Sequence, residues 1–126
     1  MNSNKIPTEL PIAVDGVCTL SVECWRLMRI AELEKVGNTG VALRHAARRI
    51  SETLKEIGIE VVDFAGRNYD PGMVPEVVEI REVSDLPDGC AVVDETIAPT
   101  VTWRGQVVKP GQIIVKRAFV RSPDLA

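Results

Sequence analysis

The spacing of apolar residues along this chain changes at Gly58. Before it, apolar side chains recur every three or four residues, as on one face of a helix, at Leu43, Ala46, Ala47, Ile50, Leu54 and Ile57. The pattern predicts a helix over residues 41–57, and Gly58 stands where a helix commonly ends in glycine. From Ile59 on, the apolar residues alternate as they do in strands. We therefore expect an α+β protein, with helices first and a small all-β head after them.

Another helix is predicted earlier in the chain, ahead of residues 41–57. It is expected to follow Thr19 or Ser21, since either can cap a helix, and to continue through Lys35. The segment Gly37-Asn38-Thr39-Gly40 then breaks the chain, so the two helices should form an antiparallel hairpin. This divides the chain into a polar N-terminal arm (1–18), a helical hairpin (19–58), a β head (59–117) and a C-terminal tail (118–126).

One hairpin cannot cover both of its own apolar faces. Either the sheet that follows folds back onto it, or a second copy of the chain completes a dimeric four-helix bundle. A lone hairpin would leave Leu27, Leu43, Ile50 and Leu54 partly in water. These four residues are therefore the expected dimer interface of a homodimer.

Short strands are expected in the last part of the chain, at residues 59–64, 77–83, 91–94, 100–103, 106–108 and 112–116. The turns Pro87-Asp88-Gly89 and Arg104-Gly105 predict hairpins between the strands that flank them. Pro71, Pro75, Pro99 and Pro110 keep these strands short.

Charge and cysteine content narrow the function classes. The net charge of -3 gives no global electrostatic reason to bind nucleic acid or an anionic membrane. Three cysteines at no metal-ligand spacing argue against a disulfide framework or a zinc site and favour a reducing cytoplasm. Residues 1–11 lack the apolar core of a secretion signal, and no apolar run approaches the roughly 20 residues that span a bilayer. We expect a cytoplasmic protein with no membrane or nucleic-acid partner.

No constellation of side chains predicts catalysis. His45 is the only histidine and lies among arginines on the second helix, where an exposed or bundle-edge position is expected. Cys24 and Cys90 could act as nucleophiles only beside a base, so a small enzyme requires the fold to bring one of them to His45. We expect no catalytic residues, no metal and no cofactor.

Four short motifs appear in a recognisable order: LKEIGIEVVD at residues 54–63, YDP at 69–71, LPDG at 86–89 and RGQVVKP at 104–110. Together with the preceding helical hairpin, they resemble the GrpE family of nucleotide exchange factors over about residues 20–117. The chain departs from the family pattern in having a short arm where a long paired helix is usual. Val74, Pro75 and Gln106 also replace the usual histidine, glutamate and arginine. The resemblance is to a divergent, shortened member.

The resemblance implies a homodimer whose four-helix bundle carries two small β heads, one of which wedges into the ATPase domain of a DnaK-type chaperone and releases ADP. It also implies a set of partner-binding positions: Tyr69, Pro71, Ile97, Gln106 and Val115. Gln106 stands where the family's arginine reaches a chaperone carboxylate, and Ala42 stands where a small residue allows helices to approach. For Tyr69 and Val115, a core role in the head is the alternative.

Three functions are consistent with these patterns. The first is a nucleotide exchange factor, or co-chaperone, for a DnaK-type ATPase. The second is a dimeric binding or regulatory module that keeps the GrpE-like head but has lost exchange activity, which Gln106 favours. The third is the small enzyme that would need His45 beside a cysteine.

Overall fold

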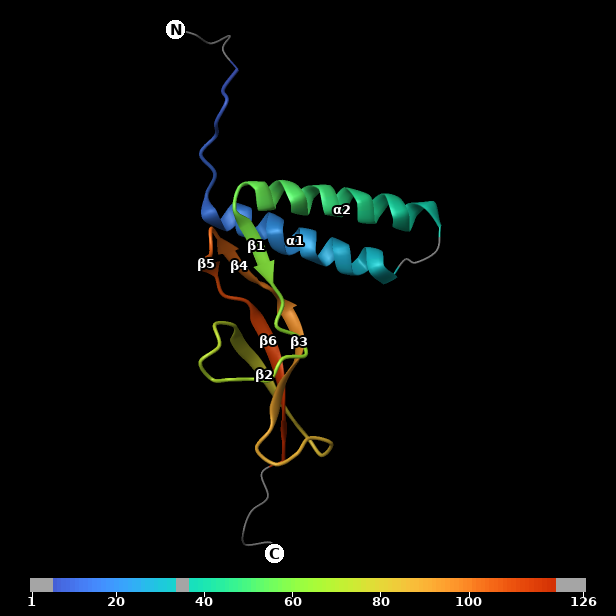
Figure 1. Ribbon diagram of the computed structural model, residues 1–126, viewed down its shortest axis with the longest axis vertical. Coiled ribbons are helices and arrows are strands. Elements are labelled where there is room, and N and C mark those ends of the chain that lie inside the picture. Colours follow the sequence, from blue (N-terminus) through green and yellow to red (C-terminus); the bar gives the residue numbers. More distant parts are fainter. Residues whose placement is uncertain (1–5, 34–36, 120–126) are drawn as a thin grey trace, which may run out of the picture.

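A computed structural model describes residues 6–33 and 37–119. Two helices, α1 (Val14–Leu33) and α2 (Asn38–Glu56), lie side by side across one end of two small sheets (Figure 1). The expected α+β class, with two helices followed by a small β region, is confirmed. None of the described helices is long and apolar enough to cross a membrane.

Both helices begin earlier than expected. The α1 helix starts at Val14, inside the predicted arm. Thr19 does not cap it, and the Thr19 hydroxyl donates to the carbonyl of Asp15 within the helix, at 2.9 Å. The α2 helix starts at Asn38, within the predicted break. The expected end of the first helix, Lys35, lies outside the described residues. Gly58 follows α2 with a φ of 91°, as expected for the glycine that ends a helix.

The strands form two three-stranded sheets. The first sheet contains β1 (Ile59–Val62), β4 (Thr100–Trp103) and β5 (Gln106–Lys109) in the order β1-β4-β5, and all its pairs are antiparallel. The second contains β2 (Glu76–Val83), β3 (Ala91–Ala98) and β6 (Gln112–Ala118) in the order β2-β6-β3. In this sheet β6 runs parallel to β2 and antiparallel to β3.

Only one of the two predicted hairpins forms. Arg104 and Gly105 both have positive φ, 50° and 81°, and join β4 to β5 in a two-residue turn closed by the Trp103–Gln106 pair. The prediction of a hairpin at Pro87-Asp88-Gly89 is wrong, because β6 lies between β2 and β3 and pairs with both. The run Ile113-Ile114-Val115 is buried throughout, and the central position of a sheet suits such a strand.

Each sheet has its own apolar core. Cys18 and Val22 of α1 pack with Ile59 and Val101 of the first sheet, and Leu54 of α2 packs against this cluster. The helical hairpin is thereby attached to the first sheet. In the second sheet, the core consists of three buried residues, Val93, Ile113 and Val115, with side chains of the β1–β2 loop packed against them.

The two sheets are joined where β3 continues into β4 and β5 continues into β6. Pro99 is fully buried at the first of these connections, and Gly111 lies directly against it at the second. The Gly111 N–H donates to the Thr100 hydroxyl at 3.0 Å, and its carbonyl accepts from the N–H of Glu76 at 2.8 Å. This crossing therefore holds the start of β2, β4 and β6 together.

Replacing Gly111 by alanine should strongly destabilise the protein. An added Cβ would lie 2.5 Å from the carbonyl oxygen of Ala98 and 2.7 Å from the nitrogen of Thr100, and neither backbone atom can move without displacing a strand. We expect Gly111→Ala to lower the free energy of unfolding by about 2 to 3 kcal/mol. Gly72→Ala is the matched control, since its Cβ would meet only the Asp70 carboxylate at 3.6 Å. Urea unfolding measures both, and equal stability of the two variants would contradict the tight crossing.

Candidate partner-binding surfaces

The segment that carries Tyr69 and Pro71 runs along the outer edge of β3. Gly66 donates to the Val93 carbonyl, Val93 to that of Arg67, and Tyr69 to that of Ala91, each at 2.8 Å. Tyr69 is half-buried and packs against the core of the second sheet, so part of its ring serves that core. Pro71 is exposed, in a turn that brings the Met73 N–H to the Asp70 carbonyl. This turn offers a partner Pro71 and the edge of Tyr69.

Val115 has a role in the core, which was the alternative to a role in partner binding. Its side chain is only 2% exposed and lies in the central strand of the second sheet. A partner cannot reach it without displacing the side chains that pack over it, among them Phe64, Tyr69 and Met73.

Ile97 lies near the opposite end of β3 from Tyr69. It is 37% exposed and lines a hollow of about 650 Å³ between β3 and α1, together with Trp25 and Arg29. Arg29 stacks on the Trp25 ring at 4.7 Å, and it donates to the carbonyl of Thr96 at 3.4 Å. Tyr69 is hydrogen-bonded to Ala91. Ile97 lies six residues further along β3, which corresponds to about 20 Å. The two predicted contact residues therefore do not belong to one compact patch.

Gln106 is exposed at the turn between β4 and β5, in the first sheet. Its pairing partner, Trp103, donates its indole N–H to the Ile57 carbonyl at 3.1 Å, so this turn lies beside the end of α2. Tyr69 contacts the other sheet. The predicted contact positions are thus spread along the molecule. A partner that contacted all of the exposed positions would have to extend along the length of this molecule.

The predicted dimer residues divide into two groups. Leu54 packs against the core between the helices and the first sheet, which explains its burial without a second copy. Leu27 and Ile50 are 37% and 43% exposed, Leu43 is half-buried and Ala42 is exposed.

An apolar stripe runs along the hairpin at heptad spacing. It consists of Leu20 and Leu27 on α1, of Leu43 and Ile50 on α2, and of Ile57 directly after α2, and we call it the hairpin stripe. Seven-residue spacing is typical of seams between helices in bundles. Leu27 is five residues from Val22, which places it about 140° around α1 from the side that packs on the sheet. The expected dimer interface contained three members of this stripe and did not contain Leu20 and Ile57, although both follow the same spacing.

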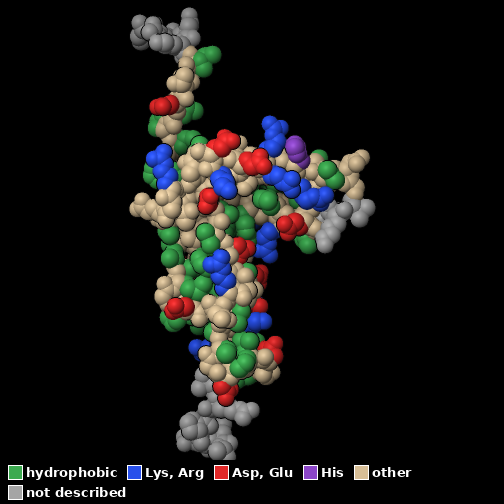
Figure 2. All heavy atoms as spheres, viewed as in Figure 1, with side chains coloured by type: hydrophobic (Ala, Val, Ile, Leu, Met, Phe, Trp, Pro, Cys, Tyr) green, Lys and Arg blue, Asp and Glu red, His purple; other side chains and the backbone are tan. Residues whose placement is uncertain are grey.

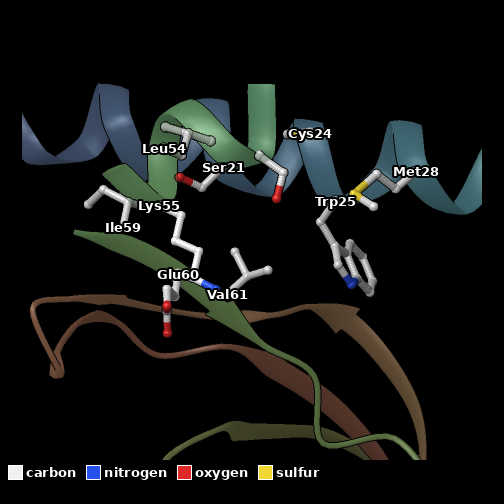
Figure 3. A pocket seen from close by; sticks show the side chains of 10 residues that line it. Ser21, Cys24, Trp25, Met28, Leu54, Lys55, Ile59, Glu60 and Val61 are labelled. Atoms are coloured by element: carbon white, nitrogen blue, oxygen red, sulfur yellow. The ribbon is translucent and has the colours of Figure 1, made fainter. Parts of the chain in front are cut away.

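A smaller hollow, of about 290 Å³, lies where α1 and α2 cross β1 (Figure 3). Trp25 and Met28 enter it from α1, and Lys55 of α2 extends along Glu60 of β1. The Ser21 hydroxyl donates to the Val17 carbonyl at 2.8 Å and is already satisfied. Among residues 6–33 and 37–119, no group of three or more His, Cys, Asp or Glu side chains could hold a metal ion.

The cysteines differ sharply in environment. Cys18 and Cys24 are buried, and burial raises the pKa of both thiols. Cys24 donates to the carbonyl of Ala47 at 3.3 Å. In the part of the chain that is described, neither Cys24 nor the exposed Cys90 is hydrogen-bonded to His45, and Figure 2 shows the single histidine at the surface among Lys and Arg side chains of the helices.

Comparison with known proteins adds no assignment. No protein-family model matches the chain, and no curated protein matches it.

We expect one of the three thiols to react rapidly with Ellman's reagent in the native protein. Cys90 is exposed, whereas Cys18 and Cys24 are buried with raised pKa values and should react at least about tenfold more slowly. In guanidinium all three should react at once. Cys90→Ser is the control, and a native Cys90→Ser protein that still reacted rapidly would show that the helix–sheet core is open.

Proposed function

We propose that this chain is a GrpE-like nucleotide exchange factor, a co-chaperone that promotes ADP release from a cytoplasmic DnaK-type ATPase. The observation that carries the proposal is the order of parts. A helical hairpin ends at Gly58 and continues directly into a head of two small sheets. The motif segments then fall at the joints of this head, in the loop beside β3 and in the β2–β3 and β4–β5 turns.

The action we propose requires no bond to be made or broken. An exchange factor binds the open state of the ATPase cleft more tightly than the closed state, and this difference in affinity sets how far the population shifts. Such a head has to be stiff. The crossing at Gly111 and Pro99 supports this requirement, because it ties both sheets together through buried backbone.

The contact surface we propose contains fewer residues than the resemblance implied. It contains the exposed positions Pro71, Ile97 and Gln106 and the edge of Tyr69, and Val115 is left out of it. Val78 and Ile80 on β2 are further exposed apolar side chains of the second sheet, and they were not singled out from the sequence.

The homodimer is the second part of the proposal. The hairpin stripe presents partly exposed leucine and isoleucine side chains at heptad spacing on the helices, and this is the surface that a second hairpin would cover in a four-helix bundle. Ala42 would lie at the margin of such an interface. Leu54 would contribute little to it, since its side chain packs within one chain.

A dimeric regulatory module without exchange activity is the other candidate. It is favoured by Gln106, whose exposed side chain has no charge where the GrpE family has arginine. Measuring the release of a fluorescent ADP analogue from DnaK-type ATPases, with and without this protein, separates the two. Faster release of the analogue supports the exchange factor, whereas binding without faster release supports the module.

Replacing Ile50 by aspartate should dissociate the dimer. The charge would have to be buried in the bundle, so we expect the dimer dissociation constant to rise by at least about tenfold. Val41→Asp is the matched control: it is also an exposed aliphatic residue of α2, but nine residues, or two and a half turns, place it on the opposite side of the helix. Sedimentation equilibrium measures both, and a parent chain that stays monomeric at micromolar concentrations would refute the dimer.

Replacing Gln106 by arginine should strengthen the interaction with a general DnaK-type chaperone. A charge-assisted hydrogen bond is typically worth about 1.5 to 3 kcal/mol, which corresponds to about tenfold or more in affinity, and the gain should shrink as salt is added. The side chain is exposed at the start of β5, next to the turn, so the fold should tolerate the change. Stopped-flow ADP release at two salt concentrations measures it. An unchanged rate would mean that the partner lacks the matching carboxylate.

A further inference from the structure

Arg104 has an unusual backbone conformation at the first position of the β4–β5 turn. Its φ is 50°, and among residues 6–33 and 37–119 it is the only residue other than glycine with a positive φ. Two-residue hairpin turns of this kind need a positive φ at both positions, which asparagine or glycine adopts at lower cost than arginine. Such a conformation persists where the surrounding contacts hold it, and it is often found at functional sites.

The contacts of Arg104 are with the end of α2. Its N–H donates to the Gly58 carbonyl at 2.8 Å, and its guanidinium stacks on the Trp103 ring at 4.7 Å. A Cβ on Gly58 would lie 2.9 Å from Arg104 Cγ and 3.4 Å from Trp103 Cδ1, so both side chains lie directly against this glycine. Asparagine would suit the turn better but has no guanidinium to stack on the ring.

The Trp103 indole fixes the turn at a second point. Its N–H donates at 3.1 Å to the carbonyl of Ile57, the residue at which α2 ends. Carbonyl groups at a helix C-terminus have no partner within the helix, so they need donors from elsewhere in the chain. The β4–β5 turn thus lies against the junction of α2 and β1 (Figure 1), and it cannot move away from α2 without breaking both bonds.

Trp103 also sets the position of Gln106. The two residues pair across the turn, and on its other side Trp103 pairs with Ile59, which is buried in the core between α1 and the first sheet. Trp103 itself is 41% exposed and belongs to neither core. Its bond to Ile57 therefore fixes the turn and contributes little to the packing of the sheets.

We propose that Trp103 and Arg104 are positioning residues, which hold the β4–β5 turn in one orientation so that Gln106 meets its partner already ordered. The inference rests on the proposed function, because it takes Gln106 to be a contact residue. A turn that is ordered before binding loses less conformational entropy when the complex forms, and the affinity is higher for that reason.

Hydrogen exchange measured by NMR tests whether the turn is held. In the parent, the Trp103 indole N–H should exchange at least about tenfold more slowly than that of Trp25, for which the described residues provide no hydrogen bond. Trp103→Phe keeps a ring but removes the N–H, and the Arg104 amide should then exchange at least about tenfold faster. Trp25→Phe is the matched control and should leave this amide unchanged. Two indole groups that exchange equally fast, or an Arg104 amide that Trp103→Phe does not affect, would overturn the inference.

A double-mutant cycle in the ADP-release assay tests the positioning role. Gln106→Arg should speed release by about tenfold in the parent and by less than about threefold in Trp103→Phe, because an arginine on a loosened turn has to become ordered on binding. A change that only weakened the fold would leave the two gains equal, and equal gains would show that Trp103 does not position residue 106. Circular dichroism should be the same for all four proteins.

The remaining outcomes separate this inference from the proposed function. If release is accelerated but Gln106→Arg gives no gain in the parent, the concentration of Trp103→Phe that gives half-maximal release decides. A rise of at least about threefold supports positioning, and no rise overturns it. If neither the parent nor any variant accelerates release, the proposed function is wrong and so is the contact role of the turn, whereas the exchange rates still show whether Trp103 and Arg104 hold the turn to α2.

Discussion

The close contact between Gly111 and the backbone around Pro99 is the constraint on which the architecture depends. Two strand pairs cross there, and each continues from one sheet into the other. Because no side chain separates the crossing backbones, the Thr100 hydroxyl and the Gly111 N–H meet at 3.0 Å, and the Gly111 carbonyl receives the start of β2. Two small cores, each too small to be a stable unit alone, are thereby combined into one body.

Local features of this fold could be predicted from the sequence, whereas its long-range pairing could not. The apolar spacing before Gly58 and the turn at Arg104-Gly105 depend on neighbouring residues, and both predictions were confirmed. The insertion of β6 between β2 and β3 depends on contacts between distant segments, for which a Pro-Asp-Gly turn carries no information. The start of α1 was missed because Asp15-Gly16 favours a turn in isolation, yet the helix gains burial of Cys18 and Val22 on the first sheet.

The candidate site shows the same division. Gln106 was expected as the first strand residue after the Arg104-Gly105 turn and is the exposed first residue of β5, because a two-residue turn projects its flanking side chains whatever the rest of the chain does. Alternation identifies Val115 as a strand residue but cannot say whether its face is covered, and the loop containing Phe64, Tyr69 and Met73 covers it. Separate motifs also gave no warning that Tyr69 and Ile97 lie near opposite ends of one strand. Their separation follows from the pairing of the loop with β3.

The unusual breadth of apolar character on α1 has a physical explanation in this arrangement. One side, with Cys18 and Val22, packs on the first sheet, and another, with Cys24 and Ala31, packs on α2. Leu20 and Leu27 are not in the helix–sheet core and are 60% and 37% exposed. A helix that makes two contacts within the chain needs no third apolar side for stability. This third side is therefore the strongest physical argument for the proposed pairing of the hairpin with a second helical surface.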